Sequence, residues 1–255
     1  MRANIRKVLR RRQTVLAPKS ARNSTVNKTP DEPERPMSWL CPRALHVCAR
    51  MSAHAVGKAA EIAGDRVYVE IDRRGALYVG SNGAALLAVR RQNDHAVINE
   101  FTGNLLIPAR DCLFDEEVLA GDLGPQTFLR CVANPEGSYS LAGWTRSIFT
   151  PLQSEYFDWR TYLVSVPEPV SKLAEPPRFD YALAALFTLA HKLVPEVGAP
   201  IILPSAPKQA ARVQFAKGMA VGMIMPMLGD VAALPYPPPW LNDLTPTPTP
   251  TRRPR

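Results

Sequence analysis

The chain has 255 residues, 46% of them apolar, which is long enough for one large domain or two small ones and sufficient to bury a core. A wholly disordered chain is therefore excluded. Charged residues make up 21% of the sequence, and no apolar run approaches the ~18 residues that cross a bilayer, so a membrane protein is excluded as well. Four cysteines without a C-x-x-C pair are too few for a disulfide scaffold and indicate a reducing, cytoplasmic setting.

The net charge of +8 is concentrated at the two ends of the chain. Residues 1–36 contribute +7 and residues 245–255 contribute +3, which leaves residues 37–244 at −2. A nucleic-acid-binding surface on this central body therefore has to be argued from local residues rather than from the net charge.

Residues 1–36 are rich in arginine and end in a cluster of prolines, so no folded element is predicted there. Three interpretations remain open: a mitochondrial transit peptide, which implies the mitochondrial matrix; a disordered basic arm that contacts nucleic acid; or translated sequence upstream of a start at Met37. At the other end, residues 231–255 combine proline, threonine and arginine, which is typical of an extended tail. Such a tail is either simply solvated or a peptide ligand for a partner.

Between these ends, the sequence predicts one helix followed by three strands, an order that occurs three times. The predicted helices span residues 42–56, 109–119 and 181–194, the last capped by Asp180. The predicted strands span residues 66–72, 76–80 and 85–90, then 104–108, then 127–133, 138–142 and 145–150, and finally 200–203, 210–216 and 220–225. The predicted fold class is α+β, with antiparallel sheets packed on helices.

Catalytic and metal-binding signatures are absent from the sequence. The four histidines are scattered, and no nucleophile-elbow, zinc-protease or phosphate-loop motif occurs. Cys41, His46, Cys48 and His54 lie close together, but on a helix His54 is turned about 120° from Cys48, so four ligands do not converge. Asp115–Glu117 is interpreted as an exposed acidic face. We therefore expect no metal, no cofactor and no enzymatic activity, with a hydrolase of unrecognised family as the enzymatic alternative.

Three short segments, spread across the chain, carry more specific signals. Residues 77–88 predict a strand, a tight glycine turn and a strand, and residues 155–163 bring aromatic side chains and an arginine into a connector. Residues 221–228 predict an apolar strand that ends in Met-Pro-Met. Since proline is tolerated at the end of a strand, this strand should stop near the surface, where methionines offer an adaptable apolar contact. Taken singly, each segment is explained by core or linker packing.

In this order, the three segments resemble motifs of the bacterial DNA polymerase III beta sliding clamp family and its shortened, phage-type relatives. Gly-Ser-Asn-Gly-Ala-Ala-Leu at 80–86 is similar to the family's Ala-Thr-Asp-Gly-His-Arg-Leu. Tyr-Phe-Asp-Trp-Arg-Thr-Tyr at 156–162 is similar to its Phe-Pro-Asp-Tyr-Arg-Arg-Val, and Met-Pro-Met-Leu at 225–228 to its Met-Pro-Met-Arg. Residues 106–110 also resemble the Ile-Pro-Arg that begins a clamp helix. The resemblance covers about residues 40–228.

The resemblance implies a DNA-clamp-like fold with three half-repeats, where a full clamp subunit has six. It divides the chain into a disordered basic arm (1–36), a clamp-like domain of two half-repeats (37–155), an interdomain connector (156–178), a half-domain (179–230) and a disordered tail (231–255). The implied function is that of a non-catalytic processivity factor or adaptor in DNA replication, cytoplasmic and associated with the nucleoid.

In the clamp family, the three segments line an apolar pocket that captures short linear peptides of DNA polymerases and other replication proteins. Carried over position by position, the resemblance implies a peptide-binding pocket formed by Ser81, Gly83, Leu86, Thr161, Tyr162, Met225, Pro226 and Met227. Each apolar anchor of a bound peptide contributes ~1–3 kcal/mol. Alanines at 84 and 85, Thr161 and Leu228 replace histidine and arginine residues of the family's motifs, which removes polar contacts from the pocket.

A clamp that encircles DNA also needs basic helices facing the duplex, because neutralising phosphates provides a sequence-independent hold. The first helix offers Arg43, Arg50 and Lys58 as DNA-contact candidates, whereas the second is acidic around Asp115–Glu117. We therefore expect a clamp-like adaptor rather than a closed ring made by this chain alone, and double-stranded DNA and a second copy of the chain remain open as further partners. The alternative is a clamp fold retained as a regulatory or decoy scaffold without peptide binding.

Overall fold

The computed structural model describes residues 35–53, 64–93, 97–121, 128–143, 146–153, 155–170, 177–206 and 208–227. The predicted tail and all but the last two residues of the predicted basic arm lie outside these ranges. The helices are α1 (Pro42–Ser52), α3 (Glu116–Ala120), α4 (Trp159–Ser165) and α5 (Tyr181–Leu193), with short 3-10 helices η1 (Ala109–Cys112) and η2 (Pro195–Val197).

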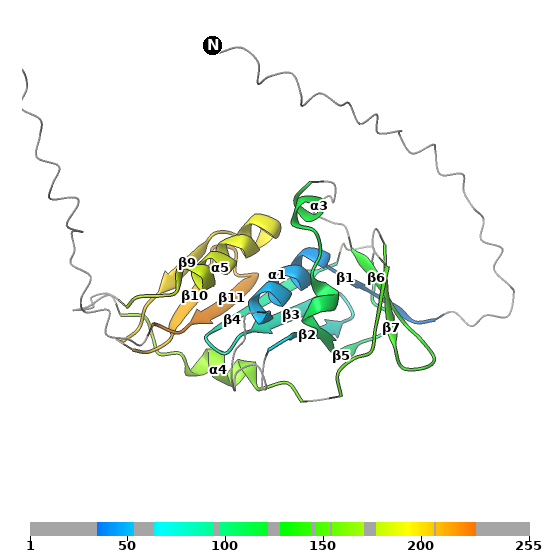
Figure 1. Cartoon of the computed structure of the whole chain (residues 1–255), viewed down its shortest axis with the longest axis horizontal. Helices are drawn as coiled ribbons and strands as arrows, with labels where there is room; N and C mark the ends of the chain where they lie inside the picture. The colour runs from blue at the N-terminus through cyan, green and yellow to red at the C-terminus, as the bar shows by residue number, and fades with distance from the viewer. Residues whose placement is uncertain are drawn as a thin grey trace, which may run out of the picture. The chain divides into compact units, whose positions relative to one another are not determined.

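The described strands form two antiparallel sheets (Figure 1). A seven-stranded sheet has the order β5-β2-β3-β4-β11-β10-β9, and a four-stranded sheet has the order β1-β6-β7-β8. The strands are β1 (Met37–Leu40), β2 (Arg66–Asp72), β3 (Gly75–Ser81), β4 (Ala85–Gln92), β5 (Gly103–Pro108), β6 (Leu129–Ala133), β7 (Tyr139–Ala142), β8 (Arg146–Phe149), β9 (Pro200–Leu203), β10 (Ala211–Phe215) and β11 (Ala220–Ile224). The predicted α+β class with antiparallel sheets is confirmed.

The first two repeats exchange a strand. The first repeat comprises β1, α1 and β2–β4, and the second comprises β5, η1, α3 and β6–β8. Strand β5 leaves its own repeat and pairs with β2, from Arg66↔Pro108 to Ile71↔Gly103. Strand β1 in turn pairs with β6, from Met37↔Val132 to Leu40↔Leu129. Each sheet is therefore completed by a strand of the other repeat.

The third repeat, α5 with β9–β11, extends the sheet of the first repeat. Strand β11 pairs with β4 from Ala220↔Val89 to Ile224↔Ala85, so one sheet runs across both repeats. Helices α1 and α5 contact each other over the same face of this sheet (Figure 1). Alternation along β4 points Leu87 and Val89 into the core beneath the helices, while Leu86 and Ala88 belong to a second apolar cluster. We call this second side the outer face.

Helix α1 lies against β3 with almost no space between the two backbones. A Cβ atom at Gly80 would lie 2.0 Å from the carbonyl oxygen of Cys48, so only glycine fits at this position. The Tyr78 hydroxyl, fully buried, accepts a hydrogen bond of 2.7 Å from the N–H of Cys41 at the start of the helix. Helix α1 is therefore held on the sheet by close contact between its backbone and that of β3, as well as by buried side chains.

Three sequence predictions about the elements need correction. The helix predicted over 109–119 is split, because the Asp115 carboxylate accepts hydrogen bonds from the N–H groups of Glu117 and Val118 and starts a new helix there. Strand β1 was missed, since four residues bounded by Pro36 and Pro42 carry too little pattern. Helix α4 was also missed, and it lies within the segment predicted as a connector. Helix α1 ends at Ser52, and residues 54–56 of its predicted span lie outside the described residues.

Candidate functional site

The glycine hairpin between β3 and β4 is held by side-chain hydrogen bonds to its own backbone. The Asn82 amide oxygen accepts from the N–H groups of Ala84 and Ala85, at 3.0 and 2.7 Å. The Ser81 hydroxyl donates to the carbonyl of Ala85 at 2.9 Å. Gly83 has φ of 85°, a left-handed conformation that side chains with a Cβ rarely adopt. The sequence Ser-Asn-Gly-Ala thus specifies a rigid turn.

The last strand contacts this hairpin directly. Met223 lies opposite Leu86 in the β11–β4 ladder, and the N–H of Met225 donates a 2.7 Å hydrogen bond to the carbonyl of Ala84. The strand ends at Ile224, so Met-Pro-Met follows it, and Met227 is 54% exposed. The strand therefore ends at the buried Ile224, and the chain reaches the surface at Met227.

The aromatic connector folds as helix α4 and packs on the outer face of the same strands. Asp158 caps the helix by accepting a hydrogen bond of 3.2 Å from the N–H of Thr161. Trp159 and Leu163 follow at i and i+4 on one side of the helix, and both pack in the cluster on the sheet, as does Val166 just after the helix. This spacing, together with an aspartate before it, is the signal that could have predicted the helix.

All three sequence segments therefore meet in one apolar cluster, which we call the outer-face cluster. Its buried members are Val79, Leu86, Ala88, Trp159, Val166 and Met223. Partly buried apolar residues packed against them are Tyr68, Leu77, Tyr156, Phe157, Leu163, Ala210 and Met225. The first and last of these segments, more than a hundred residues apart in sequence, thus share one packing unit with the middle one, at the junction of the first and third repeats.

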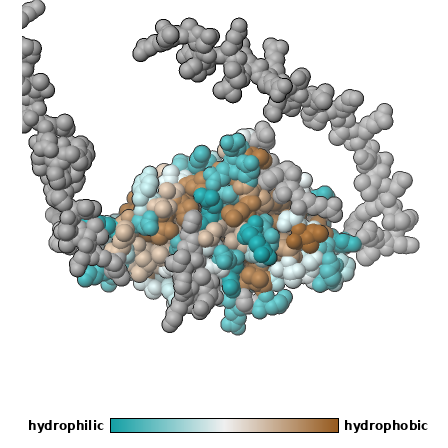
Figure 2. All heavy atoms as spheres, viewed as in Figure 1, coloured by the Kyte–Doolittle hydropathy of each residue, from teal (hydrophilic) through white to brown (hydrophobic). Residues whose placement is uncertain are grey.

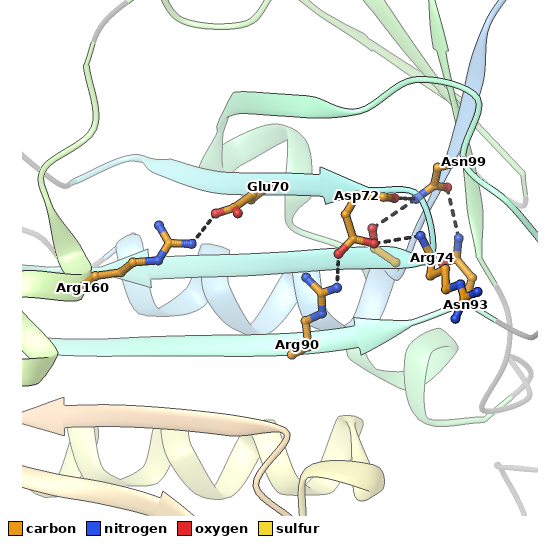
Figure 3. A network of polar contacts seen from close by, with 8 residues as sticks. Glu70, Asp72, Arg74, Arg90, Asn93, Asn99 and Arg160 are labelled. Carbon is orange, nitrogen blue, oxygen red and sulfur yellow. Dashed lines mark hydrogen bonds and ion pairs between the residues drawn. The ribbon is translucent and has the colours of Figure 1, made fainter.

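Polar contacts fix α4 at both ends. Arg160 reaches across to Glu70 on β2 with a hydrogen bond of 2.5 Å (Figure 3), and its guanidinium lies 4.3 Å from the centroid of the Trp159 ring. The hydrogen bond to Glu70 raises the pKa of Arg160 above its ordinary value. At the other end, Arg212 on β10 donates to the carbonyl of Val166 at 2.8 Å. The helix therefore bridges strands of the first and third repeats.

A second polar network lies at the far end of the same strands. Asp72 forms an ion pair with Arg90 and accepts from the N–H of Arg74 at 2.7 Å (Figure 3). Burial opposes the ionisation of Asp72, but the hydrogen bonds from Arg90 and Arg74 outweigh it and lower the pKa of this carboxyl. Asn99 donates to the Asp72 carbonyl at 2.7 Å and accepts from the Trp39 N–H at 2.8 Å. This network holds the β2–β3 turn against β1.

The eight residues implied as a peptide pocket divide into a buried and an exposed group. Ser81, Leu86 and Pro226 are buried, Met225 is partly buried, and Gly83, Thr161, Tyr162 and Met227 are exposed. Leu86, at 2% exposure, lies under the surface as part of the cluster. The solvent-accessible apolar surface of the set comes from Tyr162, which is 53% exposed, together with Met225 and Met227.

A cavity of about 490 Å³ lies beside the cluster, between β5, the segment that leads into α4 and the start of that helix. It is lined by Tyr68, Asn104, Leu105, Leu106, Pro151, Leu152, Gln153, Glu155, Tyr156, Phe157, Asp158, Trp159 and Arg160. None of the eight predicted residues lines it. Tyr68 and Tyr156 stack at 5.3 Å in its wall, and burial raises the pKa of Tyr156 well above its ordinary value.

The two described DNA-contact candidates face the second repeat. The Nε of Arg43 donates to the carbonyl of Leu119 at 2.8 Å, and the Nε of Arg50 lies 3.8 Å from the Glu116 carboxylate. Lys58 lies outside the described residues. In the view of Figure 2, hydrophilic and hydrophobic side chains are interspersed rather than forming a uniformly hydrophilic surface. The part of α1 proposed to meet DNA thus also serves to hold α3.

The buried histidine of α1 takes part in the same contact. His46 accepts a hydrogen bond of 3.0 Å from the N–H of Phe114 through Nδ1, and its Nε2 lies 3.4 Å from Glu116. Burial lowers the pKa of His46, although the neighbouring Glu116 partly opposes this. No group of three or more side chains able to hold a metal ion occurs within the described ranges. Among the described helices, none is long and apolar enough to cross a membrane.

The sequence matches no protein-family model and no curated protein. Solved structures, however, share the fold. A chain from Eubacterium rectale assigned as a DNA polymerase III beta subunit aligns with a TM-score of 0.51 and 10% identity, over 76% of this chain and 66% of that one. The DNA polymerase sliding clamp of Bacillus subtilis aligns with a TM-score of 0.50 and 13% identity, over 78% of this chain and 66% of the clamp.

The chain thus has the fold of bacterial beta sliding clamps, as its motifs implied. It spans slightly less than two thirds of the length of either clamp. The similarity at 10–13% identity establishes the architecture, and the activity has to be argued from the residues of this chain.

Proposed function

We propose that this protein is a clamp-like, non-catalytic replication factor that binds short linear peptides of DNA polymerases or other replication proteins. The observation that carries the proposal is the convergence of the hairpin, α4 and the end of β11 in the outer-face cluster. Leu86, Trp159 and Met225 come from three distant segments and pack in that one cluster. In a clamp fold, such a junction between repeats presents an apolar surface next to exposed backbone, which suits an extended peptide.

The accessible residues define how a peptide binds. Tyr162 and Met227 are about half exposed, so an apolar peptide side chain can cover them without displacing the packed core. Met225, only partly buried, has the flexible thioether side chain that adapts to different anchors. Leu86 and Trp159 are buried in the same cluster as Met225, and we assign them a supporting role. Binding therefore relies on one or two apolar anchors, each contributing ~1–3 kcal/mol.

Fluorescence anisotropy with a labelled clamp-binding peptide tests this proposal. Met225→Ala and Tyr162→Ala each remove part of one apolar anchor site and should weaken binding by about 5-fold to 100-fold, the equivalent of ~1–3 kcal/mol. Ile148→Ala is the matched control, because Ile148 is 62% exposed on β8 of the other sheet. Equal affinity of the Met225, Tyr162 and Ile148 variants would contradict the assignment of the site.

A scaffold without peptide binding is the second candidate, favoured by the alanines at 84 and 85. The two positions differ in the structure. Ala85 is 1% exposed and lies in the core under the helices, so an arginine there would bury a charge. Ala84 is partly exposed and can accept a larger side chain. If the natural protein binds no peptide and Ala84→His creates affinity, the scaffold function replaces the first proposal.

Contact with double-stranded DNA is a further part of the proposal. Arg50 is 43% exposed at its side chain, so it can approach a phosphate while near Glu116. Retention of the full chain on nicked circular DNA, lost on linear DNA, would indicate an encircling assembly. Retention on both forms that falls with salt and with Arg50→Ala would indicate a simple electrostatic contact. No retention on either form would remove DNA from the proposed function.

A further inference from the structure

The cavity of about 490 Å³ between β5 and the start of α4 has no part in the peptide site proposed above, because none of the eight residues of that site lines it. Two polar groups of its wall lack partners. Within the described residues, the exposed Glu155 carboxylate forms no hydrogen bond or ion pair, and the hydroxyl of Tyr156 is buried without a hydrogen-bond partner. Because an unpaired buried polar group is unfavourable and a carboxylate only accepts hydrogen bonds, this wall suits a ligand that donates them.

The charge of the wall favours a cation. Glu155 and Asp158 line the cavity with two carboxylates. Arg160 is the one cation among the described residues that line it, and its guanidinium donates a hydrogen bond of 2.5 Å to Glu70 on β2. Three carboxylates against one guanidinium leave the wall, with Glu70 included, at a net charge of −2.

Aromatic rings make the same wall suitable for a flat cation. The rings of Tyr68 and Tyr156 are stacked, with their centroids 5.3 Å apart. A guanidinium stacks on such rings while its N–H groups donate to a carboxylate. Arg160 already binds in this way, since its guanidinium lies 4.3 Å from the centroid of the Trp159 ring and is paired with the carboxylate on β2. An arginine from outside the cavity would meet the same combination of rings and carboxylates.

The chain carries such arginines in a segment that follows the outer-face cluster. The described residues end at Met227, and Met225 packs in that cluster with Tyr156 and Trp159, which also line the cavity. Residues 245–255, which we call the arginine segment, lie outside the described residues. Their sequence is Thr-Pro-Thr-Pro-Thr-Pro-Thr-Arg-Arg-Pro-Arg, with three arginines and no acidic residue.

The arginine segment has the length and composition to reach and bind the cavity. Arg252 is 25 positions beyond Met227, and at ~3.1 Å per residue an extended proline-rich chain of that length spans about 78 Å. Proline limits the freedom of the unbound chain, so such segments lose little entropy when they dock on aromatic surfaces. Because the segment is tethered, its effective concentration at the cavity is about millimolar. A weak contact is therefore sufficient.

We propose that the cavity between β5 and α4 binds the arginine segment of the same chain. A guanidinium of the segment stacks on the aromatic wall and donates to the Glu155 carboxylate, and the neighbouring prolines lie against the rings. The charge of +3 on the segment complements the −2 of the wall. The chain thus carries a ligand for its own surface, at a place separate from the peptide site of the outer-face cluster.

Fluorescence anisotropy of a labelled synthetic peptide of residues 245–255, titrated with the full chain, tests the proposal. A released variant combines Arg252→Gln, Arg253→Gln and Arg255→Gln and so loses its internal ligand. We expect it to bind the peptide at least about tenfold more tightly than the natural chain does, because nothing then competes for the cavity. The matched control combines Arg10→Gln, Arg11→Gln and Arg12→Gln, which removes the same charge from residues 1–36. It should bind the peptide as weakly as the natural chain.

A charge reversal in the wall locates the site. In the released variant, Glu155→Lys should weaken peptide binding at least about tenfold. Glu117→Lys is its control, because Glu117 is an exposed carboxylate on α3 that does not line the cavity, and it should leave the affinity unchanged. Both substitutions replace exposed side chains, and circular dichroism of each variant checks that the fold is intact.

Three results overturn the proposal. A released variant that binds the peptide no more tightly than the natural chain, or not at all, shows that the arginine segment does not occupy the cavity. A control variant at residues 10–12 that gains as much affinity as the released variant, or equal losses from Glu155→Lys and Glu117→Lys, shows general charge attraction instead of a site. These results are independent of peptide binding at the outer-face cluster, because the eight residues of that site do not line the cavity.

Discussion

A single methyl group added at Gly222 tests how the third repeat joins the first. Gly222 lies in β11 opposite Leu87, with an ordinary strand conformation, so backbone freedom does not require glycine there. A Cβ atom would lie 2.6 Å from the carbonyl oxygen of Leu86 and 2.6 Å from a ring carbon of Phe187. Because carbon atoms pack at ~3.5–4.0 Å, both neighbours would have to retreat by about 1 Å.

Neither neighbour can move freely. The oxygen of Leu86 belongs to the backbone of the paired strand β4, and Phe187 is fully buried between α5 and the sheet. Forcing one extra carbon into such a site costs ~1–3 kcal/mol, and we expect Gly222→Ala to lower the free energy of unfolding by about 2–3 kcal/mol. Urea unfolding followed by circular dichroism measures this change. Val221→Ala, at a 38% exposed position on the same strand, should change it by less than about 1 kcal/mol.

Phe187→Leu provides a second arm of the experiment. The shorter side chain removes the ring carbon that a Cβ at 222 would meet but leaves the carbonyl of Leu86 in place. Gly222→Ala should therefore cost about 1 kcal/mol less in the Phe187→Leu background than in the natural one, a coupling that a double-mutant cycle measures. If Gly222→Ala changes the free energy of unfolding by less than about 0.5 kcal/mol, the described close packing of Gly222 against Phe187 is wrong.

Two further predictions concern titratable groups. Since burial lowers the pKa of His46 from 6.5, the unfolded chain binds a proton that the folded protein excludes, so the free energy of unfolding should fall as the pH drops through 6.5. His46→Gln should flatten this slope in urea unfolding at a series of pH values, and an unchanged slope would contradict the described burial of His46. Burial also raises the pKa of all four thiols, that of Cys131 to about 12. Native protein should therefore be unreactive toward a thiol reagent near neutral pH and react at all four cysteines in urea, whereas a fast-reacting thiol in the native protein would contradict the described burial.

Most strands could be predicted from the sequence because their apolar residues alternate and their turns carry Gly or Asn. The predicted range 66–72 is that of β2, whose residues alternate between buried and partly buried. The Asp180 cap was also predicted correctly, and its carboxylate accepts from the N–H of Ala182 at 2.7 Å. These features depend on local chemistry, which a few neighbouring residues determine.

The separate start of α3 and the whole of α4 were not predicted, although each has an aspartate cap in the sequence. Asp115 was interpreted as part of an acidic face, whereas its carboxylate caps a new helix. Trp159 was interpreted as connector packing, although it begins a helix that Asp158 caps and whose apolar side packs on the sheet. In both cases the sequence contains the capping aspartate, but the tertiary structure shows that a helix begins there.

For the candidate site, the sequence determined the three segments and their order, since each is a short motif with its own turn or cap. Only the tertiary structure decided which of their residues face solvent. Leu86 and Ala85 are neighbours on β4, yet one supports the outer-face cluster and the other lies under the helices, because adjacent strand residues point to opposite faces. The exchange of β1 and β5 between repeats also arises only in the fold, because strand pairing joins backbone groups that no local pattern identifies.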